Sequence, residues 1–157
     1  IRKREIIGMR RIDPLVAIEK NTWFFLANNS AEQMLYCLKR ISEPCTEHIG
    51  NNFAPLDAEV YEPYLELRTK VRALIDRTAK LLQDNAFDQA EAIRSDAQQV
   101  QTELSALRKR YIDQMTAHAD GTAMQNANLV YINVLQETQE LLSALRHLIR
   151  GVAKLYR

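Results

Sequence analysis

The sequence predicts an all-α protein, an antiparallel up-down four-helix bundle of long helices. The chain has 157 residues, 46% of them hydrophobic, and only four Gly and four Pro, a composition typical of a helix-rich domain large enough to bury one core. Apolar residues recur at steps of three and four along most of it. Short segments rich in Gly, Asn and Asp divide this pattern into four parts. Long helices joined by short turns pack most simply as antiparallel neighbours.

The first predicted helix covers residues 14–49. Its start is predicted by Asp13 as the N-cap and Pro14 at the first helical position, and Pro44 predicts a kink. The expected buried stripe comprises Val16, Trp23, Ala27, Ala31, Met34, Leu38, Ile41, Cys45 and His48. An alternative stays open at residues 28–30, because Ser30 and Gln33 have the spacing of a capping box that would start a separate helix.

The other three helices are predicted over residues 58–84, over 88–118, and from a capping box of Thr122 and Gln125 to about residue 155. Each carries a seam at steps of mostly three and four. The second helix has Tyr64, Leu67, Val71, Leu74, Thr78 and Leu81. The third has Ala90, Ile93, Ala97, Val100, Leu104, Leu107 and Tyr111. The fourth has Leu129, Ile132, Leu135, Leu142, Leu145, Ile149 and Val152.

The formal net charge of +1 conceals two basic chain ends. Residues 1–11 and 141–157 each have a net charge of +4, which leaves −7 for the remainder. In an up-down bundle both ends lie at one pole, beside the turn at residues 84–88. The cations there include Arg2, Lys3, Arg4, Arg10, Arg11, Arg150, Lys154 and Arg157. Such a cluster is typical of the cytoplasmic flank of a membrane protein, although cations at a helix C-terminus also complement the macrodipole. The small net charge argues against nucleic acid as a partner.

The first helix carries more apolar residues than one seam needs. A second stripe comprises Leu15, Ile18, Thr22, Phe25 and Leu26, all near the cationic pole. We expect it either to pack inside the bundle or under residues 1–10, or to form a docking face for a partner.

Two segments resemble a known family. These are GMRRIDPLVAIEKNTWFFLANNSAEQMLYCLKRISEPCTEHIGNNFAPL and VYINVLQETQELLSALRHLIRGVAKLYR, which resemble the PhoU-like cytosolic domain of bacterial sodium/phosphate cotransporters. The resemblance implies a basic juxtamembrane linker (residues 1–13), a PhoU-like bundle (residues 14–157) and a transmembrane domain upstream. It also implies a place at the cytoplasmic face of the bacterial inner membrane. The expected function is non-enzymatic regulation of phosphate uptake, by docking on the transmembrane domain and on anionic lipid.

The resemblance also implies metal binding, because PhoU proteins hold metal ions on Glu/Asp-x-x-x-Asp motifs. Asp84 and Asp88 have this spacing. The motif falls in a predicted turn, where Asp88 and Glu91 instead fit a capping box. A second acidic motif is missing from the sequence. A divalent-metal sensor therefore remains an alternative function, as does a free-standing scaffold that dimerises through the second stripe; no other cofactor is expected.

The sequence offers little for catalysis. None of the three histidines follows a Glu at the spacing of a di-iron motif, and Cys45 with His48 makes only half a zinc site. Cys37 and Cys45 lie eight residues apart on one predicted helix, about 12 Å, which is too far for a disulfide. We expect free thiols in the core, aromatic residues that serve packing, and no enzymatic activity.

Overall fold

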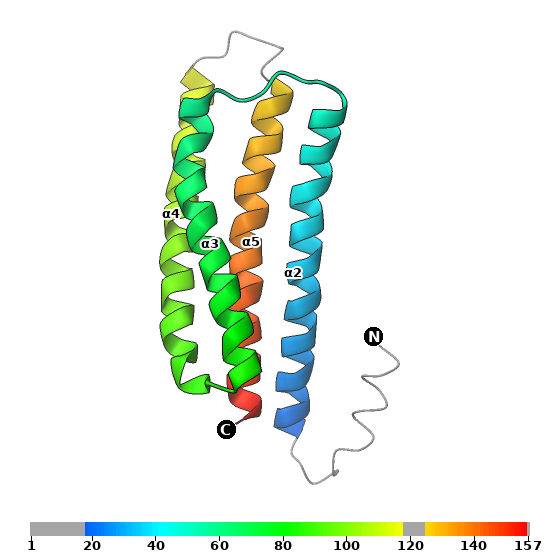
Figure 1. Cartoon of the computed structure of the whole chain (residues 1–157), viewed down its shortest axis with the longest axis vertical. Coiled ribbons are helices and arrows are strands. Elements are labelled where there is room, and N and C mark those ends of the chain that lie inside the picture. The colour runs from blue at the N-terminus through cyan, green and yellow to red at the C-terminus, as the bar shows by residue number, and fades with distance from the viewer. Residues whose placement is uncertain (1–17, 118–124, 157) are drawn as a thin grey trace.

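The computed structural model describes residues 18–116 and 127–156 in full, and the backbone of Ala117, Gln125 and Asn126. It contains four long helices: α2 (Ile18–Gly50), α3 (Ala58–Asp84), α4 (Ala90–Ala117) and α5 (Gln125–Leu155), with a short 3-10 helix η1 (Phe87–Gln89) before α4. The helices lie side by side along the long axis (Figure 1). The prediction of an all-helical chain with four helices packed against one another is confirmed. The predicted helix starts at Asp13 and Thr122 lie outside the described residues.

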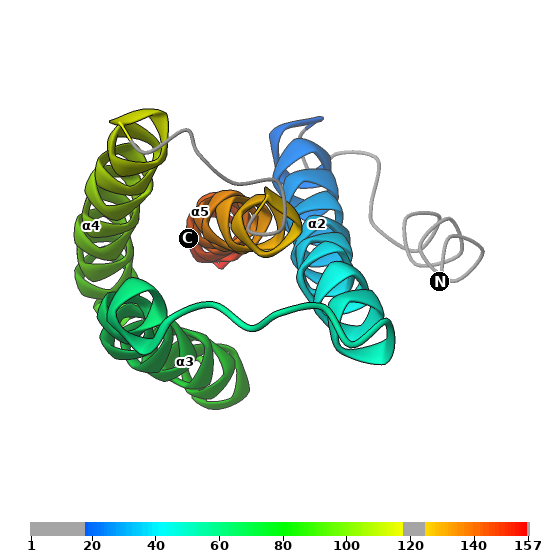
Figure 2. The same cartoon turned by 90° about the horizontal axis from the view of Figure 1, so that it is seen from above.

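Helix α5 is the centre of the fold. It packs against α2 and α4 and more lightly against α3, while α3 and α4 pack against each other. Viewed from above, α2 and α4 lie on opposite sides of α5 (Figure 2). Because neighbours surround it, α5 supplies most of the fully buried side chains: Leu135, Leu141, Leu142, Leu145 and Ile149.

The seams predicted for α3 and α4 are confirmed. All of their residues are buried except Tyr64, which is half-buried and packs against the core. Helix α3 ends at Asp84, because Asn85 adopts a left-handed conformation (φ 54°) and donates its backbone N–H to Leu81. This turn, with η1 after it, carries the chain into α4.

Helix α2 is continuous through residues 28–30, so a separate helix starting at Ser30 is wrong. The Ser30 hydroxyl donates to the carbonyl of Leu26 at 2.7 Å, and the Asn28 side-chain amide donates to that of Phe24 at 3.1 Å. Both polar side chains bond to the preceding turn of the same helix, as such residues do inside helices. The helix also continues past Pro44 to Gly50.

Two seam predictions are wrong. Leu38 is 45% exposed, whereas its neighbour Cys37 is buried. Helix α2 turns its small residues toward α5, which brings the two helices close together and leaves Leu38 outside. On α5, Leu129 is 62% exposed because the buried side of the first turns carries Ala127, Asn128 and Tyr131 instead.

Three tyrosines join α3, α4 and α5 near the end of the bundle where α3 and α5 begin and α4 ends. The Tyr131 ring makes edge contacts with Tyr64 and Tyr111, at centroid distances of 6.3 and 4.9 Å. Their hydroxyls bond, respectively, to the Val60 carbonyl, the Thr138 hydroxyl and the Asn128 side chain. The predicted packing role of these tyrosines is confirmed, because each buries its ring and satisfies its polar tip.

Candidate docking site at the chain-end pole

The candidate site lies where α2 begins, α5 ends and the α3–α4 turn is found (Figure 1). We call this end of the molecule the chain-end pole. Of the predicted contact residues, the structure describes Ile18, Phe25, Leu26, Arg150 and Lys154. The others lie outside the described residues: Arg2, Lys3, Arg4, Arg10, Arg11, Leu15 and Arg157.

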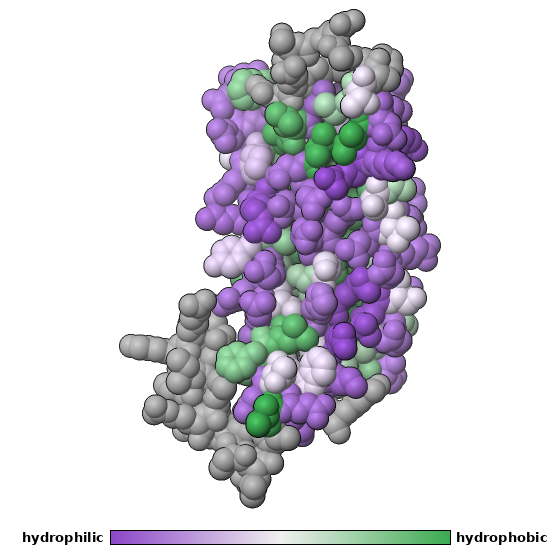
Figure 3. All heavy atoms as spheres, turned by 180° about the vertical axis from the view of Figure 1, so that it is seen from behind, coloured by the Kyte–Doolittle hydropathy of each residue, from purple (hydrophilic) through white to green (hydrophobic). Residues whose placement is uncertain are grey.

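The fold exposes part of the second apolar stripe of α2 and half-buries another part. Ile18 is 87% exposed and Phe25 51% exposed, while Leu26 is half-buried. Seven residues separate the first two, which returns them to one side of the helix. From behind, hydrophobic side chains gather near the end where α2 begins (Figure 3). Packing inside the bundle is therefore wrong for Ile18 and Phe25, while packing under residues 1–10 concerns residues outside those that the structure describes.

Close helix packing leaves these residues outside. A Cβ placed on Gly151 of α5 would lie 3.1 Å from the backbone nitrogen of Ala27 and 3.1 Å from the carbonyl oxygen of Trp23. Such contact requires small residues on both helices, so Ala27 faces α5. The opposite side of α2, with Ile18 and Phe25, then points away from the bundle.

Arg150 and Lys154 lie in the last turns of α5, on exposed positions. The guanidinium of Arg150 lies 5.5 Å from the centre of the Trp23 ring, close enough for a cation–π interaction between α5 and α2. Neither cation takes part in a salt bridge with a described residue. Arg150 and Lys154 of the predicted cationic tail are therefore exposed at the pole.

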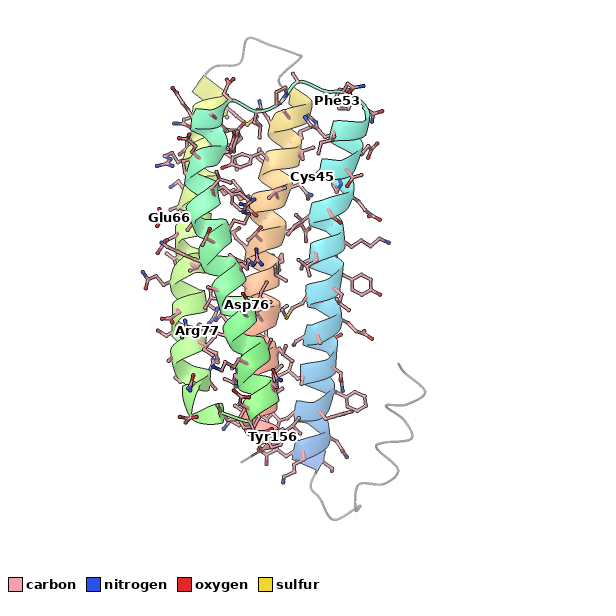
Figure 4. The ribbon with its side chains drawn as sticks, viewed as in Figure 1. Cys45, Phe53, Glu66, Asp76, Arg77 and Tyr156 are labelled. Carbon is pink, nitrogen blue, oxygen red and sulfur yellow. The ribbon has the colours of Figure 1, made fainter. Side chains whose placement is uncertain are left out.

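An aromatic stack fastens the α3–α4 turn to the same pole. The rings of Phe87 and Tyr156 are 4.6 Å apart and inclined by 23°. Tyr156 lies at the end of α5, beside that turn (Figure 4). Sequence reasoning placed the turn at this pole but missed the stack, whose only signal was one aromatic residue in the turn and one just after α5.

The predicted metal pair is split by the turn. Asp84 is the last residue of α3, Asp88 lies in η1, and both are exposed. Among the described residues, no group of three or more His, Cys, Asp or Glu side chains is arranged to hold a metal ion. The capping box predicted for Asp88 is wrong, because η1 precedes α4 and the Glu91 carboxylate instead accepts a 2.7 Å bond from Arg94.

The thiols are free, as predicted. Cys37 is buried between α2 and α5, and Cys45 is half-buried. Burial raises the pKa of both thiols, and for Cys37 the nearby Arg40 opposes this only in part. A raised pKa disfavours the nucleophilic thiolate, so these thiols serve packing.

The chain matches no protein-family model, and neither the curated proteins nor the solved structures contain a significant match to it. None of the helices in the described ranges has both the length and the apolar character needed to cross a membrane.

Proposed function

We propose that this chain is a PhoU-like up-down bundle that regulates a bacterial sodium/phosphate cotransporter by docking on its transmembrane domain. The observation that carries the proposal is the exposure of Ile18 and Phe25 at the chain-end pole. Apolar side chains beside cations suit a surface that contacts both a membrane protein and anionic headgroups. The resemblance of the sequence to PhoU-like cotransporter domains supplies the partner.

The proposed mechanism needs no catalytic group. The position of the bundle at the cytoplasmic face of the membrane would favour some states of the transport cycle over others. A docked bundle changes uptake only if its affinity differs between those states. Ile18 and Phe25 would then supply apolar contact, and Lys154 with the basic residues 1–11 would supply attraction to anionic lipid.

The test is phosphate uptake by cells that express the complete cotransporter with Ile18→Ser and Phe25→Ser. Ile49→Ser and Leu129→Ser are the matched control, because these side chains are 74% and 62% exposed near the opposite pole. We expect the first pair to change the rate or apparent affinity of uptake, and the control to leave both unchanged. Equal uptake in all strains would refute the proposal.

The same variants separate the free-standing scaffold from the regulatory domain. A scaffold that dimerises through the second stripe would lose its dimer in the Ile18→Ser, Phe25→Ser protein while uptake stayed normal. Sedimentation velocity of the isolated bundle measures this directly.

A further inference from the structure

A small pocket lies at the end of the bundle opposite the chain-end pole. We call this end the distal pole; α2 and α4 end there, and α3 and α5 begin there. The pocket has a volume of about 240 Å³, opens to solvent and is mostly apolar. It is lined by residues of α2, of the loop after α2 and of α5: Pro44, Glu47, His48, Phe53, Leu129 and Val130. Since a cavity of about 150 Å³ accommodates a benzene ring, this pocket has room for one large apolar side chain.

Local contacts hold Phe53 at the end of α2 (Figure 4). Asn52 has a left-handed backbone (φ 51°), which turns the chain back after the helix. The Phe53 N–H donates to the carbonyl of His48 at 3.2 Å. The His48 ring lies 5.5 Å from the Phe53 ring and donates through Nε2 to the carbonyl of Ala54 at 3.0 Å. This wall of the pocket is therefore formed in the free protein, which favours binding.

Two large apolar side chains of the pocket are exposed. Phe53 is 44% and Leu129 62% exposed. They come from segments far apart in the sequence and line one concavity, unlike apolar residues scattered singly over a surface. Exposed apolar side chains around a pocket are typical of a site that receives an apolar group.

The protein around the pocket is acidic. Residues 43–62, which form the end of α2, the following loop and the start of α3, include no Lys or Arg and five acids: Glu43, Glu47, Asp57, Glu59 and Glu62. Within the described ranges only Glu43 forms a salt bridge, with Lys39 at 3.5 Å between exposed side chains. Helix α4, whose last turns carry Lys109 and Arg110, lies across α5 from α2 (Figure 2). The acids of α2 therefore keep their charge available to a ligand.

The size and the charge of the pocket together select the ligand. Unpaired carboxylates repel lipid headgroups, nucleic acids and phosphate. Pockets for small molecules usually measure about 300 Å³ or more, so this one is small for such a ligand. A protein segment with one large apolar side chain between Lys or Arg residues meets both requirements. Its apolar side chain fills the pocket, and its cations lie beside the carboxylates of α2.

We infer that the distal pole binds a basic segment of a partner protein, with one aromatic or leucine side chain in the pocket and the cations beside Glu43 and Glu47. The inference goes beyond the proposed function, which uses the opposite end of the bundle. The two can fail separately. The proposed function expects normal uptake from a transporter with Leu129→Ser, whereas this inference expects weaker binding of a basic peptide by the same variant.

The probe is a fluorescein-labelled peptide with one Phe between two runs of Lys, titrated with the 157-residue chain and followed by fluorescence anisotropy. We expect saturable binding that weakens as NaCl is added, because salt screens exposed charges. A peptide with Ala in place of Phe should bind about tenfold more weakly, because it leaves the pocket empty.

Two changes in the chain should each weaken binding about tenfold or more: Phe53→Ala, and Glu43→Gln with Glu47→Gln. Leu129→Ser is a further variant for the apolar contact, because this side chain is 62% exposed and its loss should not affect folding. Circular dichroism checks the helix content of each protein.

The matched control is Glu66→Gln with Asp76→Asn, which removes the same charge from exposed positions of α3 (Figure 4). It should bind the peptide as the unchanged protein does. The variant Ile18→Ser with Phe25→Ser should also bind normally, because these residues lie at the chain-end pole.

Four results would overturn the inference. The first is the absence of saturable binding. The second is equal affinity for the Phe and Ala peptides, or an equal loss in the α3 control, which would mean unspecific charge attraction. The third is full affinity in the Phe53→Ala and Glu43→Gln, Glu47→Gln proteins, which would place the peptide elsewhere. The fourth is self-association of the chain that the Glu43→Gln, Glu47→Gln variant abolishes, which would make the basic residues 1–11 of a second copy the occupant.

Discussion

The side-chain amide of Asn133 on α5 donates a 3.0 Å hydrogen bond to the backbone carbonyl of Arg40 on α2. Arg40 lies four residues before Pro44, and a proline has no N–H to give to the carbonyl four residues earlier. Asn133 therefore supplies, from another helix, the donor that Pro44 lacks. Beside it, the Arg40 guanidinium binds Glu137 of α5 at 2.8 Å. Helix α2 is thus held to α5 at the point where its own hydrogen bonding is interrupted.

Replacing Asn133 should matter only while Pro44 is present. We expect Asn133→Ala to lower the free energy of unfolding by about 1 kcal/mol, the usual net value of one hydrogen bond. In a Pro44→Ala background, the new N–H of residue 44 reaches the Arg40 carbonyl, and the same substitution should cost little. Urea denaturation of the two single variants and the double variant measures this coupling. Equal costs of Asn133→Ala in both backgrounds would contradict it.

Gly151 should be the most sensitive small residue of the α2–α5 junction. Its Cβ position lies 3.1 to 3.2 Å from backbone and side-chain atoms of α2, so a larger residue must push the helices apart. We expect Gly151→Leu to lower the free energy of unfolding by about 1–3 kcal/mol. Gly50→Leu is the control, because a Cβ at Gly50 meets nothing within 4 Å. Thermal unfolding of both variants would show the contrast, and similar losses would argue against close packing at Gly151.

Tyr131 should make the protein unstable at alkaline pH. Burial, together with the neighbouring Tyr111 and Tyr64, raises the pKa of Tyr131 to about 12. An unfolded tyrosine ionises near pH 10. Between about pH 10 and 12 the unfolded chain therefore releases a proton that the folded protein keeps, so stability is complete below this range and falls as the pH rises through it.

The expected loss from Tyr131 over that range is about 1–2 kcal/mol. Urea denaturation at a series of pH values measures it, and Tyr131→Phe should flatten the dependence. Part of the slope should remain in that variant, because burial also raises the pKa of Tyr64 and Tyr111. Tyr61→Phe, at a more exposed position, is the control and should leave the slope unchanged.

The sequence predicted α3 and α4 well for a physical reason. Each buries one side, so a single apolar seam describes it, and every seam residue from Leu67 to Tyr111 lies where the spacing placed it. Helix α2 follows a different rule. It approaches α5 through Ala27, Ser30 and Cys37, and hydrophobicity alone does not identify small residues as the contact side.

The candidate site was likewise predicted only in part. The position of Arg150 and Lys154 at the pole followed from helix lengths and turn positions alone. The stack of Phe87 on Tyr156 was not predicted, because it joins a turn to the end of another helix and only the fold brings the two together.

Asp84 and Asp88 provide the test between the docking function and the metal-sensor alternative. Both carboxylates are exposed, and Asn85 in its left-handed conformation separates the helices that carry them. Two solvated carboxylates with no third ligand hold a divalent ion weakly, because a tight oxygen site needs six or more ligands. We expect calorimetric titration with Mn²⁺ or Mg²⁺ to give no binding in the micromolar range, and Asp84→Asn with Asp88→Asn to change nothing. Stoichiometric metal in protein purified without chelator, lost in that variant, would instead establish the sensor.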